Sequence, residues 1–488
     1  MTELLDTLSG SLWTYLAIPM LVLSGLYLTF VCRGMQIRMV PEMFRVLGER
    51  TKGEEGSISS FKAFTISAAS RVGTGNIAGV ATAIALGGPG AVFWMWMVAL
   101  LGGATSFVES TLGQLYKSGR LYRYHGGPAY YIQRALGWRW LAVSFALMIS
   151  VTYGLVFNSV QANSIVDAMQ GSFGGPQGSV ALSWGVGIAL ALLTAVVIFG
   201  GVQSISKVSV TVVPVMALLY LGIGAVVVAL NFERVPGVIA DIVAHAFGWR
   251  EIAGGGMGVA IMMGVRRGLF SNEAGMGSVP NASATAAVSH PVKQGLVQTL
   301  GVYFDTLVIC TMTALIILLA GPDHAYGDAT TGASLTQWAL AQQLGGWAVH
   351  YLTFAILLFA FTSVIGNYYY GESNIQYMFG GGIWLLLFRL LVVLFVLLGS
   401  VAQVSMVWAM ADLFMPLLAL INLVAILPLS GIAARLLGHY LKQRRAGLEP
   451  TFHRDDMPDL KNIECWDGSD PVTHRDDREA LLAQEKAS

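Results

Sequence analysis

The sequence predicts an all-α integral membrane protein with about eleven transmembrane helices, built as a five-plus-five inverted repeat with discontinuous lead helices and one extra N-terminal helix. Only 11% of its 488 residues are charged and 55% are hydrophobic, whereas soluble domains carry about 25% charged residues. Apolar runs near the ~20 residues needed to cross a bilayer recur along the chain. A glycine-rich motif at residues 73–77 also recurs at residues 275–279.

The apolar runs predict eleven spans. They cover residues 12–31, 62–86, 91–116, 140–168, 181–200, 208–230, 253–287, 295–320, 347–371, 383–400 and 402–430. No basic flank precedes the first run, so we expect it to be a retained helix rather than a cleaved signal peptide.

Basic residues collect on one side of the predicted spans, and cytoplasmic loops are the ones enriched in Lys and Arg. The segments after the first, third and last spans hold Arg33, Arg38, Arg45, Arg50, Lys52, Lys62, Lys117, Arg120, Arg123, Arg134, Arg139, Arg435, Lys442, Arg444 and Arg445. Residues 1–11, 170–180 and 321–345 hold none, and 231–250 holds only Arg234 and Arg250. We therefore expect the N-terminus outside the cell and the C-terminus in the cytoplasm.

Three segments outside the spans carry further expectations. Residues 125–137 are amphipathic and lie on the basic side, so we expect them on the inner membrane surface. Ser334 to Leu344 should form an outer hairpin helix, although a plain connector remains an alternative for both segments. The polar tail from Leu448 to Ser488 is expected to be solvated and disordered.

The recurring motif divides the chain. Gly73-Thr74-Gly75-Asn76-Ile77 lies in the second predicted span, and Gly275-Met276-Gly277-Ser278-Val279 lies in the seventh, 202 residues later. The two motifs lie in spans five positions apart, so they cross the membrane in opposite directions, as in transporters with inverted repeats. The predicted units are an N-terminal helix and basic loop (1–59), a first repeat (60–230), an extracellular connector (231–249), a second repeat (250–435) and a cytoplasmic tail (436–488).

The first motif should interrupt its helix. Glycine costs roughly 1 kcal/mol relative to alanine in a helix, and Thr and Asn side chains compete for backbone hydrogen bonds. Unwound backbone at this depth is tolerated only where protein or water covers it, and its free groups suit an ion and an amino acid. We assign Val72 and Gly73 to a cation site, and Thr74 and Asn76 add side-chain oxygens. A close helix–helix contact is the alternative use of these glycines.

The second break, from Leu269 to Gly275, combines an aromatic ring at Phe270, a hydroxyl at Ser271 and a carboxylate at Glu273. Charges at membrane depth are costly unless they are paired. We therefore expect a buried ion pair between Glu273 and either Arg71 or Arg267. The alternative is that these charges lie near a helix end and reach water.

Polar residues on two further spans point into the bundle. Gln161 lies one turn after Asn158 on the fourth span, so both share a helical face and Gln161 can bind a carboxylate. For Asn158 and Asn163, hydrogen bonding between helices is as good an explanation as a role in a binding site. On the ninth span, Thr362 and Ser363, with Phe359 one turn earlier, are assigned to the cation site beside the first break.

Several functional classes are disfavoured. The net charge is zero, which argues against a nucleic-acid partner. Cys32, Cys310 and Cys465 lie far apart and form neither a disulfide framework nor a zinc site. The spans carry no catalytic motif, and a channel would need rings of filter residues. We expect no enzyme activity, no metal other than Na⁺ and no cofactor beyond the co-transported Na⁺.

Four long motifs resemble the alanine/glycine:cation (sodium) symporter family. They are VGTGNIAGVATAI from Val72, the run from Gly87 to Gly102, RRGLFSNEAGMGS from Arg266 and YYYGESN from Tyr368. The resemblance covers about residues 60–435. It implies a leucine-transporter-like fold and uptake of alanine, glycine or a related small neutral amino acid with Na⁺, or sometimes H⁺.

The resemblance also implies a substrate site. Thr74, Gly75 and Asn76 should contact the amino acid, with Gln161, Phe270, Ser271 and Ala274 around it, while Ser363 and Thr362 should line the substrate or sodium site. Many family members have Trp where this chain has Asn367. An amide there should enlarge the pocket and make it more polar, so we hypothesise that glutamine or serine is accepted as well.

The sequence therefore predicts a multi-pass cell-membrane symporter that works by alternating access. Its partners are a small neutral amino acid, Na⁺ and the lipid bilayer, and no oligomeric state is indicated. The main alternative is a proton-coupled symporter in which Glu273 carries the proton.

Overall fold

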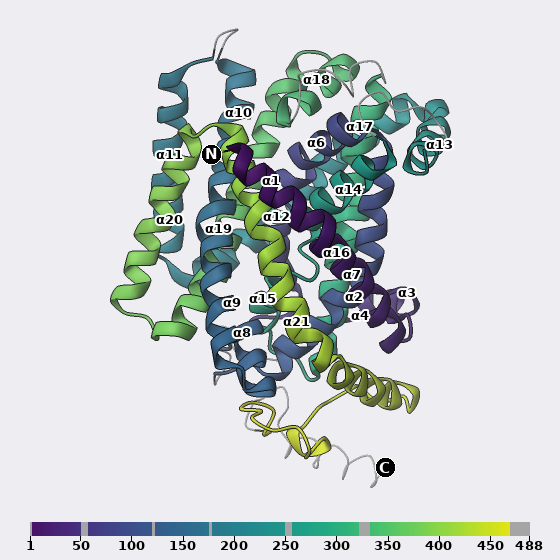
Figure 1. Cartoon of the computed structure of the whole chain (residues 1–488), viewed down its shortest axis with the longest axis vertical. Coiled ribbons are helices and arrows are strands. Elements are labelled where there is room, and N and C mark those ends of the chain that lie inside the picture. Colours follow the sequence, from purple (N-terminus) through teal and green to yellow (C-terminus); the bar gives the residue numbers. More distant parts are fainter. Residues whose placement is uncertain are drawn as a thin grey trace.

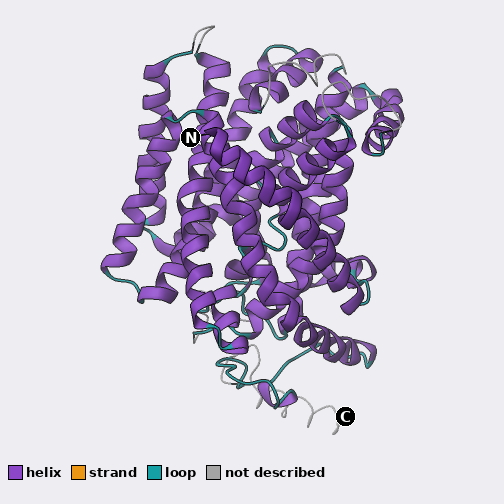
Figure 2. Ribbon diagram, in the orientation of Figure 1, coloured by secondary structure: helices purple, strands orange, loops and turns teal. Residues whose placement is uncertain are grey.

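A computed structural model describes residues 2–49, 57–119, 123–174, 178–248, 256–321 and 332–468. Within these ranges the chain is helical, and the β-pairing is limited to one isolated bridge between Ser118 and His125 (Figure 2). Arg50, Lys52, Arg120, Arg250 and the tail beyond residue 468 lie outside the described residues.

Nine helices of the described chain are long and apolar enough to cross a membrane. They are Thr7–Val31, Gly90–Leu115, Arg139–Phe173, Val180–Ile198, Ser204–Leu230, Pro291–Ala320, Trp347–Phe379, Ile383–Val401 and Val404–Arg445. Each matches one of the predicted spans, which leaves the second and the seventh.

Those two spans are the interrupted ones. The second consists of α5 (Ser60–Arg71), a 3-10 turn (Thr74–Asn76) and α6 (Ala78–Gly87). The seventh consists of α14 (Met257–Asn272) and α15 (Val279–Ser283). Between α14 and α15, Glu273, Gly275 and Gly277 have φ of 59°, 93° and 72°, a region that glycine enters at little cost. The prediction of two discontinuous lead helices is confirmed.

The remaining elements complete the bundle (Figure 1). The spanning helices are built from α1 (Thr2–Leu12), α2 (Ile18–Val31), α7 (Gly90–Leu115), α9 (Arg139–Val151), α10 (Asn158–Phe173), α11 (Val180–Ile198), α12 (Gly201–Leu230), α16 (Pro291–Tyr303), α17 (Thr311–Ala320), α19 (Trp347–Phe379), α20 (Ile383–Val401) and α21 (Val404–Arg445). The helices outside these spans are α3 (Met35–Arg38), α4 (Val40–Leu47), α8 (Pro128–Tyr131), α13 (Val235–Ala246) and α18 (Ala333–Leu344). Wider π-helical turns, at 13–17, 132–136, 152–157 and 304–310, and 3-10 turns, at 232–234 and 454–456, link or flank them.

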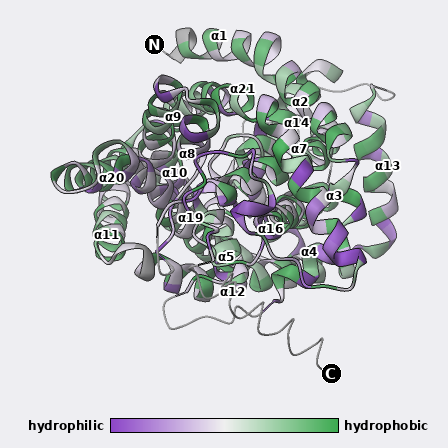
Figure 3. Cartoon of the chain, turned by 90° about the horizontal axis from the view of Figure 1, so that it is seen from below, coloured by the Kyte–Doolittle hydropathy of each residue, from purple (hydrophilic) through white to green (hydrophobic). Residues whose placement is uncertain are grey.

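The outer helices present apolar side chains to the surroundings. On α11 and α20, Leu192, Val196 and Ile383 are 64%, 76% and 61% exposed, and these helices at the rim are coloured mainly hydrophobic in Figure 3. Exposed apolar surface on this scale marks contact with lipid. The two interrupted helices lie inside this ring, and nearly all residues from Ala63 to Val80 and from Gly264 to Leu300 are buried, so their unwound turns are shielded from lipid.

Two expectations about peripheral segments are wrong. Residues 128–136 form a helix, but α8 is buried rather than lying on the membrane surface, and its Tyr131 donates a hydrogen bond to Asn422 Oδ1 at 2.5 Å. The tail is packed rather than disordered as far as residue 468, because Phe452 and Trp466 supply buried aromatic anchors. The predicted hairpin helix after the outer loop is present as α18.

Candidate functional site

The two breaks lie against each other in the middle of the bundle. Ser70, at the end of α5, donates a hydrogen bond to Glu273 Oε1 at 2.6 Å. A Cβ added at Gly75 would lie 2.9 Å from the Phe270 ring, so only glycine allows this approach. The unwound turns of the two repeats therefore form one site.

The first break is held by side chains from two other helices. Gly73 N donates to Asn76 Oδ1 at 3.0 Å, and Thr74 N donates to Gln161 Oε1 of α10 at 3.1 Å. A Cβ at Gly73 would lie 2.2 Å from the Ser363 hydroxyl of α19. Gln161 and Ser363 are therefore brought to the break, as the sequence predicts.

Two buried polar atoms at this site have no hydrogen-bond partner among the described residues: the Thr74 hydroxyl and the Asn367 amide nitrogen. Buried polar groups are normally paired, so these two atoms beside the first break are candidates for contacts with a ligand. The Ser70 hydroxyl lies 2.6 Å from both Glu273 Oε1 and Asn367 Oδ1. Its single proton goes to the carboxylate, the stronger acceptor, and the Asn367 amide can turn its NH₂ toward Ser70, so one polar atom of this amide lacks a partner in either orientation.

The predicted ion pair of Glu273 with an arginine is wrong in this structure. Arg267 Nη2 lies 2.8 Å from Asp412 Oδ2 of α21 instead. Arg71 donates to the Gln298 carbonyl at 3.1 Å and to the Ser106 hydroxyl at 3.3 Å. Glu273 accepts from the Ser70 and Ser278 hydroxyls, at 2.6 and 2.7 Å. Hydroxyls on neighbouring turns thus replace the expected counter-ion.

An aromatic layer covers one side of the second break. The Phe270 ring lies 4.9 Å from the Phe157 ring and 5.0 Å from the Trp408 ring. The Arg267 guanidinium lies 4.5 Å above Trp408, a cation–π distance, and its ion pair with Asp412 links α14 to α21. These rings and this ion pair form a lid on the side where α14 and α21 begin.

Asp305, in the π-helical turn after α16, is a site residue that the sequence analysis missed. Its carboxylate accepts hydrogen bonds from Asn76 Nδ2 of the first break at 2.7 Å and from the Ser271 hydroxyl at the second break at 2.7 Å. Thr306 adds a third at 2.9 Å. The signal was present, because an aspartate inside an apolar span is a functional candidate by default.

Glu109 of α7 is a second missed residue. It is fully buried and accepts hydrogen bonds from Gly275 N and Gly277 N, each at 3.2 Å, and from Asn422 Nδ2 at 2.7 Å. Successive backbone N–H groups in such a turn form an anion-binding concavity. Glu109 therefore fills it and fixes the shape of the second break.

Two predicted site residues direct their side chains at neighbouring helices rather than at the opposite break. A Cβ at Gly102 of α7 would lie 2.8 Å from the Ala274 Cβ, so Ala274 points at α7. The Thr362 hydroxyl bonds carbonyls of its own helix and contacts Met216 Sδ of α12 at 3.6 Å. The Phe359 carbonyl accepts from both Ser363 and Thr362, at 3.0 and 2.9 Å.

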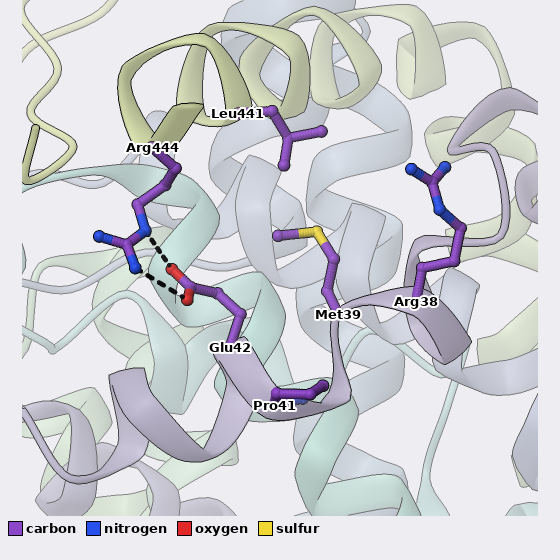
Figure 4. A pocket seen from close by; sticks show the side chains of 6 residues that line it. All are labelled: Arg38, Met39, Pro41, Glu42, Leu441 and Arg444. Carbon is purple, nitrogen blue, oxygen red and sulfur yellow. Dashed lines mark hydrogen bonds and ion pairs between the residues drawn. The ribbon is translucent and has the colours of Figure 1, made fainter. Parts of the chain in front are cut away.

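The site is closed to solvent on both sides. Thr74, Asn76, Ser271 and Ser363 are at most 1% exposed, and Phe270 is 4% exposed. A surface pocket of about 250 Å³ lies elsewhere, between α4 and α21, where Arg444 pairs with Glu42 (Figure 4). The chain is therefore in an occluded conformation.

Residues 1–454 match the sodium:alanine symporter family. The chain belongs to this family. It is 51% identical over 465 residues to the amino-acid carrier protein AlsT of Bacillus subtilis (strain 168), covering 95% of this chain and 97% of that protein. It is 48% identical over 463 residues to the probable sodium/glutamine symporter GlnT of the same organism, covering 95% of each.

The solved structure of MhsT in complex with L-phenylalanine shares the fold, with a TM-score of 0.56 at 13% identity, covering 79% of this chain and 99% of that one. The leucine-transporter-like fold with about eleven helices is thus confirmed. As a member of the sodium:alanine symporter family, the chain is a multi-pass membrane transporter that couples amino-acid movement to Na⁺, not an enzyme.

Proposed function

We propose that this sodium:alanine symporter family member binds a small neutral amino acid where Thr74-Gly75-Asn76 and Phe270-Ser271 meet and carries it into the cell with Na⁺. The contact of the two unwound turns, with the unpaired Thr74 hydroxyl and Asn367 amide nitrogen beside them, is the observation that carries this proposal. Free backbone N–H and C=O groups there suit the two charged ends of an amino acid.

The sodium ion is proposed to bind where the first break meets α19. Val72 and Gly73 supply backbone oxygens, the Ser363 hydroxyl faces Gly73, and the Phe359 carbonyl and Thr362 lie behind it. The Ser363 hydroxyl already donates its proton to the Phe359 carbonyl, so the lone pairs of the hydroxyl oxygen remain available to a cation.

The charges around the two breaks also favour a cation. Glu109, Glu273 and Asp305 are buried, and none of the three makes a salt bridge shorter than 4.0 Å with any described residue. Arg71 is also buried here, and its hydrogen bonds go to the Gln298 carbonyl and the Ser106 hydroxyl rather than to these carboxylates. Uncompensated buried charge is expensive, so an incoming Na⁺ is stabilised here.

The substrate range is proposed to include glutamine or serine besides alanine and glycine. Asn367 has a buried amide nitrogen with no partner, which can serve a polar side chain. The name of GlnT, a probable sodium/glutamine symporter 48% identical to this chain, supports the same expectation.

Proton coupling through Glu273 is the second candidate. Glu273 is buried without a salt bridge inside the described chain and is held only by Ser70 and Ser278 hydroxyls. A protonated carboxyl would be neutral in this setting, which lowers its cost of burial.

We propose that the protein lies in the plasma or inner membrane of the cell. In the proposed orientation the N-terminus is outside and the C-terminus is in the cytoplasm. Arg38, Arg45, Arg134 and Arg444 all lie at the end of the bundle where α3, α4, α8 and the C-terminal segment meet (Figure 1). By the positive-inside rule, this clustering of arginines supports a cytoplasmic location for that end. The Phe270–Trp408 lid then faces outward.

Uptake into proteoliposomes tests the proposal, with a Na⁺, a K⁺ or a pH gradient imposed separately. Alanine should accumulate with the Na⁺ gradient alone, and excess glutamine should compete. Accumulation driven by the pH gradient alone would favour the Glu273 candidate. No inhibition by glutamine alongside tight inhibition by alanine would reject the wider substrate range.

A further inference from the structure

The C-terminal residues 449–468, called the strap from here on, run back under the bundle after α21 ends at Arg445 (Figure 1). Phe452 and Trp466 are 1% and 3% exposed, and their rings lie 5.7 Å apart. Arg454 N donates to the Trp466 carbonyl at 2.9 Å, which closes the strap into a loop.

One end of the strap is bound to the second repeat. Glu449 Oε1 lies 2.5 Å from Nζ of Lys293, a buried residue at the start of α16. Phe452 N donates to the Ser289 carbonyl at 2.8 Å, and the Ser289 hydroxyl donates to the Pro450 carbonyl at 2.7 Å. This end thus lies on the link between α15, the last part of the second broken helix, and α16.

The other end is bound to the first repeat. Glu464 pairs with Arg134, in the turn before α9, and accepts from the Ser118 hydroxyl at 2.8 Å. Trp466 Nε1 donates to the Gln114 carbonyl of α7 at 3.2 Å, and Lys117 Nζ lies 4.5 Å above the Trp466 ring.

Beneath the strap, the α15–α16 link is bound to the end of α7. Gln114 Nε2 and Lys117 Nζ donate to the Ala286 carbonyl at 2.9 and 3.1 Å. The adjacent Ala287 is 2% exposed and packs with Tyr124, under Cys465 of the strap. The strap therefore spans both repeats over the inner end of the second break.

We propose that the strap is a cytoplasmic latch: its Glu464–Trp466 end must leave Gln114, Lys117 and Arg134 before the site opens inward, so it sets the balance between occluded and inward-open states. This inference rests on the proposed function and orientation. The Glu464 end is the one that releases, because its carboxylate is 50% exposed and Arg134 is 21% exposed, and exposed pairs are weak. The Glu449 end holds Lys293, which is 1% exposed and also pairs with Glu49 at 2.6 Å, and its two hydrogen bonds with Ser289 keep it on the second repeat.

The Glu464 carboxylate of the latch is ionised at neutral pH. Burial alone would raise the pKa of Glu464, but hydrogen bonds from Ser118 and Arg134 outweigh it and lower that pKa below its ordinary value. A carboxylate with a lowered pKa keeps its full stabilising effect at any pH above its ordinary pKa, and loses it only as the pH falls through the lowered pKa. The Glu464 contact therefore persists at cytoplasmic pH.

Labelling of a buried position under the strap tests the latch. Ala287→Cys in a Cys465→Ser background is exposed to a membrane-impermeant maleimide in inside-out vesicles. Glu464→Arg should raise the labelling rate at least fivefold, and adding Arg134→Glu should return it to within twofold, because the pair is restored with reversed charges. Trp466→Ala, which frees the same end without adding a charge, should match Glu464→Arg. The control Asp459→Asn alters another pair of the strap, with Arg435, that is exposed on both sides, and should stay within twofold.

Alanine uptake into right-side-out vesicles of the same variants separates a latch from a static cover. Releasing the latch lowers the fraction of transporters whose site can open to the outside. The KM for uptake should therefore rise in inverse proportion to that fraction. An unchanged labelling rate in Glu464→Arg, failure of the reversed pair to restore it, or faster labelling with an unchanged KM would each overturn the latch. Absence of Na⁺-dependent uptake in the unmodified protein would instead contradict the proposed function.

Discussion

Asp305 is the residue at which the two broken helices converge, through Asn76 and Ser271. Its carboxylate is buried and receives only neutral hydrogen bonds from the described chain. We expect Asp305→Asn to keep the shape but to raise the Na⁺ concentration for half-maximal uptake about tenfold, which corresponds to ~1.4 kcal/mol. Cys310→Ser, an uncharged neighbour of the same groups, is the matched control. An unchanged Na⁺ dependence would show that Asp305 does not sense the ion.

We propose that Asn367 sets how polar the substrate can be. We expect Asn367→Leu, of similar size without the amide, to weaken competition by glutamine at least tenfold while alanine uptake stays within threefold, because one buried hydrogen bond to a polar side chain is lost. Competition assays against labelled alanine measure both. Equal losses for the two amino acids would mean that Asn367 only positions Ser70, its partner at 2.6 Å.

At the same scale, the sequence indicates residue types but not their partners. Gln161, Phe270 and Ser363 could be predicted, because a polar or aromatic residue at a fixed helical position faces the bundle. The partner of Glu273 could not. Ser70 and Ser278 are ordinary helix hydroxyls in the sequence, and only the approach of α5 to α14 makes them ligands of this carboxylate.

Among the elements, the second break depends on Glu109. We expect Glu109→Gln to leave one of the Gly275 and Gly277 N–H groups facing an NH₂ group, since an amide has only one acceptor oxygen. The unpaired donor should cost ~1–3 kcal/mol, seen as a lower melting temperature and a weaker apparent alanine affinity. Glu233→Gln, on an exposed turn, is the control. Stability loss without any change in affinity would restrict Glu109 to a structural role.

The junction of α16, α21 and the strap should respond to acid through His290. Burial, with His439 and Lys293 nearby, lowers the pKa of His290 well below its ordinary value. Its other close neighbours are Tyr440, at 5.2 Å between rings, and Phe452 of the strap; Asp456 lies 3.8 Å from His439.

Release of the Glu464–Trp466 end takes Trp466 away from Phe452, the strap residue beside His290, so water can approach the imidazole and its pKa moves back toward the ordinary value of about 6.5. The detached state then binds more protons, so docking is complete above about pH 6.5 and weakens as pH falls below it. Ala287→Cys labelling should therefore accelerate between pH 7.5 and 5.5, relative to the Trp466→Ala variant, whose strap is already released. Adding His290→Gln should flatten the profile, and a flat profile with His290 present would contradict this link.

The breaks themselves were predictable as elements, because Gly, Thr and Asn inside an apolar run conflict with helix propensity wherever they occur. The strap was not. Its 449–468 segment is polar and charged enough to suggest disorder, and only Phe452 and Trp466 hint that it can pack. Their burial depends on a surface made by α7, α16 and α21, which no local pattern describes.

For the whole molecule, the fold follows from the number of spans and the motif offset, since two broken helices five positions apart in the order of spans must run in opposite directions. The conformational state does not follow from them. Closure over the site depends on ring contacts such as Phe270–Trp408 and on the Arg267–Asp412 pair, and sequence periodicity places such residues on a face without fixing which side is shut.

Closure around one shared site implies that sodium and substrate bind cooperatively. In the proposed sites both ligands contact the first break, Na⁺ on the Ser363 side of Gly73 and the amino acid on the Phe270 side of Gly75. By linkage, the factor by which saturating Na⁺ raises alanine affinity must equal the factor by which saturating alanine raises Na⁺ affinity. We expect a factor of 5–150, equivalent to ~1–3 kcal/mol, in calorimetric titrations of purified protein. In Ser363→Ala that factor should fall toward one, while Ser144→Ala, a change on the exposed face of α9, should leave it intact. Independent binding in the unmodified protein would mean that the two ligands do not share the first break.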